Sequence, residues 1–296
     1  MNSNTINSLN LEKNEIYKTH KFLLHFFLWS LFAQFFNFGN FYQPIAIFLP
    51  CLIYLHKNKC CRKRILKTFI PIKLKVIPLI FLLWISNYPL SILISNIFDC
   101  LFQSNINNTI IDSIPSGLWQ SILFVSLFPS LFEELLVRGI VLDGYRNKNI
   151  IVACLMNGFI FGMIHLNFYQ FSYCFILGCL SAYLVFITKS IFSAVLIHFI
   201  NNTHVCISIF FEDKNLFLIN FIESSISNPT TQYILLFALS IIGLIFIYFI
   251  LKYIKHVYGD VDYTRNTYSK EKIFNAPLIC TIIIFSFVGT IIQIVL

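Results

Sequence analysis

Long apolar runs separated by short polar segments make up most of the chain. A helix needs about 17–25 mainly apolar residues to cross a bilayer, and most of these runs approach that length. We therefore predict an all-α fold, a polytopic transmembrane helical bundle with eight or nine spans. The candidate spans are residues 22–38, 41–56, 77–98, 117–138, 150–168, 171–188, 191–210, 231–251 and 275–296.

The same pattern divides the chain into four regions. We predict a polar N-terminal tail over residues 1–21 and N-terminal transmembrane helices over 22–116. Core helices that carry the polar motifs follow over 117–210, and C-terminal transmembrane helices complete the chain over 211–296. Because no stretch remains for a soluble catalytic domain, any chemistry must take place among the helices.

Composition and charge support a membrane protein. Hydrophobic residues make up 57% of the chain and charged residues only 11%, with a formal net charge of +8. Alternating spans place every Lys and Arg except Lys214 on one side, which is the positive-inside pattern of cytosolic loops. The basic balance therefore indicates topology, not nucleic acid. The dense run from Lys57 to Lys75 also suits anionic lipid headgroups, although a plain topology signal explains it better. We expect a multi-pass protein, in the plasma membrane if the host is bacterial.

Two adjacent glutamates lie inside the fourth predicted span, where an ionised side chain costs at least about 2.5–3.5 kcal/mol. Glu134 and Arg138 are four residues apart on one helical face, so we expect them to pair. Glu133 points about 100° away from its neighbour and has no local partner. A buried acid without a partner indicates a functional group, and the structural alternative is an interhelical polar contact.

Two later spans each place a histidine beside a second side chain at helical spacing. Phe161 and His165 share one face of the fifth predicted helix, and His198 and Asn202 share one face of the seventh. The fifth helix also carries a Gly-x-x-x-Gly pattern over residues 158–162, which favours close packing against a neighbouring helix. We predict a site among the fourth, fifth and seventh helices.

The predicted depths of these groups in the membrane differ. At about 1.5 Å per residue from the cytosolic ends, Glu133 and His198 lie roughly 10–14 Å deep, but His165 lies about 22 Å deep. Convergence therefore requires helix tilt, a kink at Pro129 or a later start of the fifth helix. We expect a water-filled cavity that opens to the cytosolic half.

These residue types suit acyl hydrolysis. A buried glutamate beside an imidazole has the properties of a general base for water. A second imidazole and an amide suit the negative charge that develops on an attacked carbonyl oxygen. Alternatively, the glutamate and histidines supply ligand types that zinc accepts, and the metal would activate the water. A proton-coupled transporter is a further class, but the chain has no visible inverted repeat.

Three motifs follow one another on three helices: Glu-Glu-x-x-x-Arg at 133–138, Phe-Gly-x-x-His at 161–165 and His-x-x-x-Asn at 198–202. Together they resemble the CPBP family of intramembrane proteases. That family joins prenyl-protein (CAAX) endopeptidases with bacterial bacteriocin-processing and self-immunity membrane proteins. The resemblance covers about residues 120–210.

The resemblance implies a role for each motif residue. Glu133 would activate water together with His165, and His198 and Asn202 would hold the oxyanion. It leaves metal use open: the enzyme is either a metalloprotease, with zinc held by Glu133, His165 and His198, or a metal-free glutamate-type protease. The residues expected to support the site are Glu134, Arg138 and Phe161.

The leading hypothesis is therefore an intramembrane endopeptidase that cleaves a peptide or a lipid-anchored protein near the membrane. The alternative is a non-catalytic membrane scaffold or immunity protein that binds and stabilises a membrane partner. In a bacterial host, bacteriocin leaders, peptide pheromones or anchored surface proteins suit the enzyme better than prenylated CAAX proteins. No nucleic-acid partner is expected, and the sequence does not specify an oligomeric state.

Overall fold

The computed structural model describes residues 14–36, 38–102, 114–115, 117–211, 228–259 and 270–295. Within these ranges all regular structure is helical and no strand occurs, so the predicted all-α class is confirmed. Residues 1–13 of the predicted tail and Lys214 lie outside the described residues. The principal helices are α2 (Glu15–Ala33), α3 (Leu49–Lys57), α4 (Lys59–Leu66), α5 (Ile77–Phe102), α10 (Ile150–Met163), α11 (Phe168–Thr188), α12 (Ile191–Phe210), α14 (Pro229–Tyr258) and α15 (Ala276–Val295).

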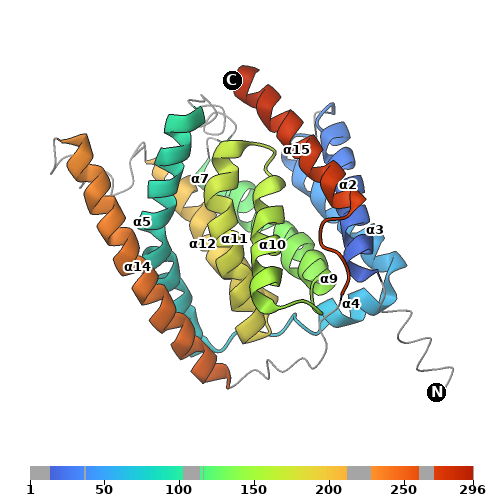
Figure 1. Cartoon of the computed structure of the whole chain (residues 1–296), viewed down its shortest axis with the longest axis horizontal. Coiled ribbons are helices and arrows are strands. Elements are labelled where there is room, and N and C mark those ends of the chain that lie inside the picture. Colours follow the sequence, from blue (N-terminus) through green and yellow to red (C-terminus); the bar gives the residue numbers. More distant parts are fainter. Residues whose placement is uncertain are drawn as a thin grey trace.

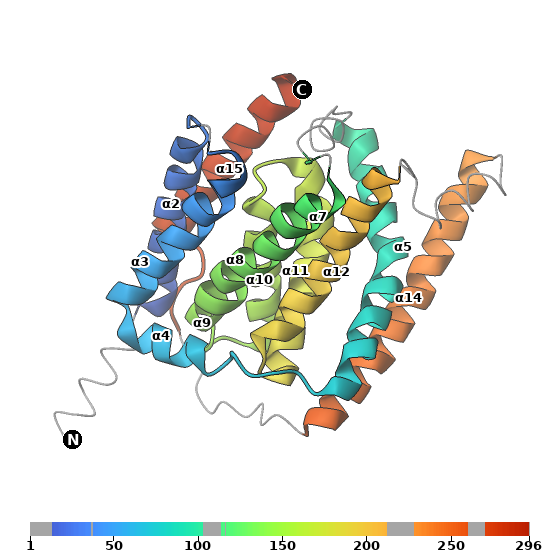
Figure 2. The same ribbon diagram turned by 180° about the vertical axis from the view of Figure 1, so that it is seen from behind.

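The motif-bearing helices lie in the middle of the bundle. Helices α10, α11 and α12 run side by side there, next to a broken helix that starts at α7 (Leu118–Ser121) and ends at α9 (Leu142–Gly144). Helix α14 packs against α5 on one flank, and α15 packs against α2 on the other (Figures 1 and 2). The outer pairs therefore enclose the three segments that carry the polar motifs.

Five helices in the described part of the chain are long and apolar enough to cross a membrane: Leu74–Phe102, Phe168–Thr188, Ile191–Phe210, Thr230–Tyr258 and Ala276–Val295. Two further predicted spans correspond to shorter apolar helices, Pro44–Lys57 and Ile150–Met163. A multi-pass membrane protein follows from these helices, and the count of eight or nine spans stays a prediction.

Close packing of α10 on α11 depends on glycines. A Cβ atom on Gly158 would meet the Phe175 carbonyl oxygen at 2.5 Å, and one on Gly162 would meet the Phe171 ring at 2.6 Å. The predicted close contact of the Gly-x-x-x-Gly face is therefore confirmed. On the facing helix, a Cβ atom on Gly178 would lie 2.7 Å from the Gly158 Cα. Because the contact would be with a backbone atom, no side-chain movement could relieve it.

Substitution of Gly178 by alanine is expected to destabilise the protein by roughly 1–3 kcal/mol, because the new methyl group must push α10 and α11 apart. Thermal unfolding of the purified protein in detergent measures this loss. Gly117→Ala is the matched control, since its Cβ would meet only the flexible Gln120 side chain, at 3.2 Å. Equal melting temperatures for the two variants would contradict this account.

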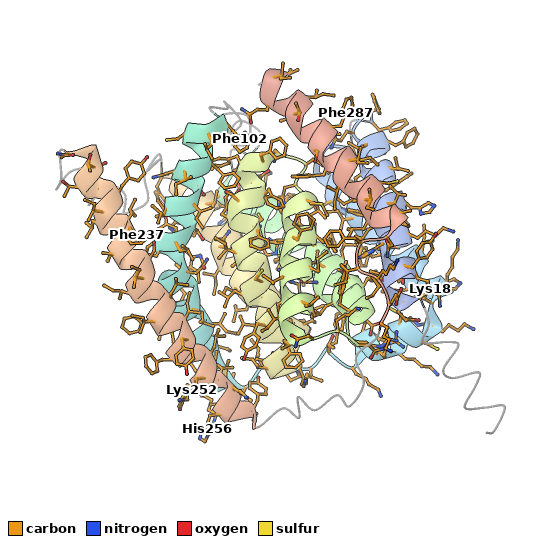
Figure 3. The ribbon with its side chains drawn as sticks, in the orientation of Figure 1. Lys18, Phe102, Phe237, Lys252, His256 and Phe287 are labelled. Atoms are coloured by element: carbon orange, nitrogen blue, oxygen red, sulfur yellow. The ribbon has the colours of Figure 1, made fainter. Side chains whose placement is uncertain are left out.

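Basic side chains gather toward one end of the bundle. Figure 3 shows Lys252 and His256 at the lower end of the molecule. Phe102 and Phe287 lie toward the opposite end in the same view. This polarity agrees with the separation of basic loops predicted from the sequence, whereas their cytosolic orientation stays a prediction.

At the basic end, an ion-pair network ties the broken helix to α2 and α4. Arg64 donates to both carboxylate oxygens of Asp143, with distances of 2.7 and 2.6 Å. Arg146 Nη1 donates to Glu15 Oε2 at 3.0 Å. The Glu271 carboxylate accepts the Ile16 and Tyr17 amides in the first turn of α2, at 3.1 and 2.7 Å. These first-turn donors otherwise lack partners, so α2 begins inside the predicted 1–21 tail.

His20 is a buried part of the same end, although the sequence suggested no role for it. Its Nε2 accepts from the Tyr145 hydroxyl at 2.6 Å, while its Nδ1–H donates to Asn275 Oδ1 at 2.9 Å. Burial lowers the pKa of His20 to about 4, partly offset by the hydrogen bond to Asn275. The neutral ring is therefore built into the junction of α2, the turn after α9 and the segment before α15.

Acid should weaken this junction. The pKa of His20 is near 6.5 in the unfolded chain and about 4 in the folded one, so its contribution to stability is complete above pH 6.5 and decreases as the pH falls toward 4. At pH 5 the loss is about 2 kcal/mol. We expect the melting temperature of the wild type to decrease more steeply than that of His20→Gln as the pH is lowered from 7.5 to 5. Parallel pH profiles would contradict the prediction.

Candidate active site

The helix that carries both glutamates alternates between α and π geometry. Between α7 and α9 it comprises the π segment η4 (Ile122–Leu127), α8 (Phe128–Glu134) and the π segment η5 (Leu135–Val141). π turns hold one extra residue per turn and are often found at functional sites. Pro129 is the second residue of α8, directly after η4, so the irregularity expected near this proline takes the form of π turns on both sides of α8.

Glu134 and Arg138 form a fully buried ion pair. Arg138 Nη1 donates to Glu134 Oε1 at 2.8 Å, and both side chains have no exposed surface. The arginine also donates from Nη2 to the Gly178 carbonyl at 3.2 Å and lies 4.3 Å over the Phe161 ring. The pairing expected from helical spacing is confirmed, and the guanidinium additionally connects the site helix to α10 and α11.

His198 is held by the same glutamate. Its Nδ1 lies 2.8 Å from Glu134 Oε1, and the carboxylate can only accept, so Nδ1 carries the proton. In the neutral ring the opposite nitrogen, Nε2, then has a free lone pair, and Asn202 Nδ2 donates to it at 3.1 Å. Asn202 Nδ2 also donates to the Val125 carbonyl at 3.2 Å. Glu134 thus fixes both the tautomer and the direction of the imidazole.

His165 lies on the turn that ends α10, and local contacts orient it. Its Nδ1–H donates to the Phe161 carbonyl at 3.0 Å, which again leaves Nε2 with the lone pair. The next residue, Leu166, has a left-handed φ of 58°, which leucine rarely adopts. Asn167 Nδ2 donates to the His165 carbonyl at 2.9 Å, and its oxygen accepts from the Gln170 amide at the start of α11. This strained, hydrogen-bonded turn holds the ring in place.

Glu133 faces the two imidazoles from the neighbouring helix. Its Oε2 lies 4.0 Å from His165 Nε2 and 3.9 Å from His198 Nε2. This oxygen is buried and has no hydrogen-bond partner in the described part of the chain. The side chains of Glu133 and His165 retain 9% and 18% exposure. Three atoms that carry lone pairs therefore face one another across a gap that one water molecule can bridge.

Phe161 packs between the two imidazoles. Its ring makes edge contacts with His165 at 5.3 Å and with His198 at 5.4 Å between centroids. The structure thus brings together all seven side chains that the sequence singled out. Nothing in the described geometry defines a water-filled cavity at this point, so that feature stays a prediction.

The helix containing Glu133 is longer than the sequence suggested, which reduces the predicted mismatch in depth. The fourth span was predicted to end at 138, but helical structure continues to Gly144 because Arg138 is paired and buried. Six more residues place Glu133 up to about 9 Å farther from that end, closer to the depth predicted for His165. The fifth helix starts at Ile150 as predicted and ends at Met163, before His165.

Sequence reasoning missed three neighbours of the motif residues. Cys174 Sγ on α11 lies 3.7 Å from His165 Nε2, and Asn167 fastens the turn described above. Asn157 Nδ2 donates to the Val137 carbonyl inside η5 at 2.7 Å. Of these, only Asn157 had a detectable signal, because a lone polar residue one turn before Phe161 needs a partner in an apolar helix.

The Glu133 oxygen lies farther from the two imidazole nitrogens than the ligands of one zinc ion lie from one another. Ligand atoms bound to one tetrahedral zinc ion lie about 3.3 Å apart, whereas Glu133 Oε2 is 3.9 and 4.0 Å from the two imidazole nitrogens. Asn202 already donates to the His198 lone pair that a metal would need. Within the described residues, no three His, Cys, Asp or Glu side chains are arranged to hold a metal ion.

Part of the chain matches a known protein family. Residues 115–204 match the family described as type II CAAX prenyl endopeptidase Rce1-like, which covers less than a third of the chain but includes all three motifs. The match supports the resemblance to the CPBP family and a membrane protease of the CAAX type. No curated protein and no solved structure shows a significant match to the chain.

Proposed function

We propose that this chain is an intramembrane endopeptidase that hydrolyses a peptide bond in a peptide or lipid-anchored protein substrate. One observation carries the proposal: the unpartnered Glu133 Oε2 faces the Nε2 atoms of His165 and His198 at 4.0 and 3.9 Å. The family match over 115–204 supports the same reaction class.

Water is activated between Glu133 and His165. Because His165 Nδ1–H is taken up by the Phe161 carbonyl, Nε2 can accept a hydrogen bond from the water. Glu133 then removes one proton as the water oxygen attacks the peptide carbonyl carbon. The carboxylate oxygen involved has no competing donor among the described residues, so it is free for this transfer.

The oxyanion is held on the side of His198. To donate from Nε2, this ring must take up a second proton from solvent as the substrate binds, while Nδ1–H continues to donate to Glu134. Arg138 Nη1 donates to the same Glu134 oxygen at 2.8 Å. With Nε2 protonated, the Asn202 amide no longer donates to the ring and can donate to the oxyanion.

Bond cleavage returns the proton. Collapse of the tetrahedral intermediate breaks the C–N bond, and Glu133 gives the abstracted proton to the departing nitrogen. The products are a carboxylate and a new amine terminus, and the side chains return to their starting state. This sequence uses only groups of the chain, one water molecule, and the solvent proton that His198 takes up and then releases.

Cleavage by the reconstituted protein tests the proposal. The full chain in liposomes should cut a farnesylated membrane-bound peptide faster than the same peptide without the lipid, with products identified by mass spectrometry. A soluble unrelated peptide serves as the control. The proposal fails if folded protein cuts none of the membrane-bound peptides, and a phenotype that survives loss of cleavage would instead support the scaffold alternative.

Metal removal distinguishes this mechanism from zinc catalysis. Because the geometry described above does not suit zinc, dialysis against 1,10-phenanthroline is expected to leave the cleavage rate within about twofold of the untreated protein. Added zinc should not raise the rate. A loss that zinc restores would overturn the metal-free mechanism, while leaving the assignment as a peptidase intact.

A further inference from the structure

A second site lies apart from the reaction centre, where α3 and α4 meet the broken helix. A pocket of about 580 Å³ opens between these elements. Its size falls in the range typical of sites for small molecules and lipid groups. Helix α4 lies at the same end of the bundle as α9 (Figure 2), so the pocket opens near the basic end.

The walls of this pocket are apolar. They include Leu52 on α3, Leu66 on α4 and Phe69 just after it, which are 45%, 59% and 43% exposed. Ile65 and Leu135 are buried and form the inner part of the wall. Apolar walls of this kind accommodate a hydrocarbon chain, and because that chain comes from the bilayer and not from water, selectivity for one lipid must come from its headgroup.

Basic side chains line the same pocket. His56 and Lys57 end α3, Arg62 lies on α4, and no acidic residue takes part in the lining. Among the described residues neither Lys57 nor Arg62 has an ion-pair partner, whereas Arg64 on the same helix pairs with Asp143 and Glu15. Helix α4 therefore uses one arginine for ion pairs within the chain and leaves another for a ligand.

We propose that this pocket binds an anionic phospholipid of the surrounding bilayer, with an acyl chain along the apolar wall and the phosphate between Lys57 and Arg62. An unpaired lysine and arginine provide the charge complementarity for a phosphate, and Arg supplies paired donors for its oxygens. Basic pockets between membrane helices suit anionic headgroups for this reason. A neutral lipid matches the apolar wall but not the charge.

The lipid would touch the helix of the candidate active site. Leu135, at the inner end of the pocket, directly follows Glu134 in the chain and begins the π segment η5. Filling the pocket packs an acyl chain against that turn. The binding itself does not depend on the peptidase activity proposed above.

Native mass spectrometry of the full chain released from detergent tests the binding. The probes are phosphatidylglycerol, phosphatidylcholine with matched acyl chains, and inorganic phosphate. We expect phosphatidylglycerol to bind at least about tenfold more tightly than phosphatidylcholine, and Lys57→Ala/Arg62→Ala to weaken it roughly 10- to 30-fold. Lys59→Ala/Lys63→Ala is the matched control, because it removes the same charge from α4 outside the pocket; it should retain binding within about twofold.

Several outcomes overturn the proposal. Equal loss in both double variants would mean that only net charge attracts the lipid. Equal binding of phosphatidylcholine would mean that the basic residues do not select the headgroup. Displacement of the lipid by millimolar inorganic phosphate would mean that a free anion is the ligand. Binding of the farnesylated peptide in place of phosphatidylglycerol would assign the pocket to the substrate. Glu133→Gln, which is expected to lower cleavage strongly, should bind the lipid normally and so separates this result from the peptidase test.

Discussion

Glu133→Gln is expected to lower the rate of peptide cleavage by at least about 100-fold, because general-base catalysis contributes roughly 10²–10⁴. The amide keeps the shape of the side chain but cannot take a proton from water. Glu133 is not part of the buried ion pair, since Arg138 pairs with Glu134. Expression, membrane insertion and thermal unfolding should therefore match the wild type. Cleavage of the farnesylated peptide in liposomes measures the loss.

Two comparisons sharpen this result. Glu133→Asp keeps the charge but moves the carboxylate about one carbon-carbon bond away from the two imidazoles. We therefore expect activity between those of the wild type and the glutamine variant. Glu15→Gln removes a carboxylate at the basic end, far along the chain from the motifs, and should keep most of the activity. A glutamine variant as active as the wild type would exclude Glu133 as the base.

Helical spacing alone predicted the local contacts of the site. Each pair four residues apart is in contact in the structure: Arg138 with Glu134 at 2.8 Å, and Asn202 Nδ2 with His198 Nε2 at 3.1 Å. The period of the α-helix guarantees a shared face for such pairs. The charged partners could be inferred because a membrane interior does not tolerate an unpaired ion.

Spacing could not predict which helices meet. The contact of His198 with Glu134 joins residues 64 positions apart, and neither the spacing nor the resemblance to a family predicted it. The π segments and the left-handed turn at Leu166 could not be predicted either. The pattern of apolar residues in the sequence is the same whether or not these irregularities are present. The fourth span was predicted to end at 138, whereas helical structure continues to Gly144.

Loss of Arg138 should have the largest effect on stability. Arg138→Met leaves the Glu134 carboxylate in a fully buried position with one donor, His198, in place of two. Removing one member of a buried ion pair costs about 3–5 kcal/mol, because the other charge stays desolvated. The variant also loses the contact with the Gly178 carbonyl. We expect a marked drop in the melting temperature and in the amount of protein in the membrane.

A second substitution should restore much of that stability without restoring the enzyme. In Glu134→Gln/Arg138→Met the buried charge is gone, and the amide oxygen of the introduced glutamine can still accept from His198, so the double variant should be more stable than Arg138→Met alone. It should cleave poorly, because the doubly protonated His198 ring that donates to the oxyanion then faces a neutral amide in place of a carboxylate. Arg64→Met, at a partly exposed ion pair, should cost no more than about 1 kcal/mol. If the double variant were as unstable as the single one, the buried charge would not be the reason for the loss, and the role of Arg138 would be packing against Phe161 and α11.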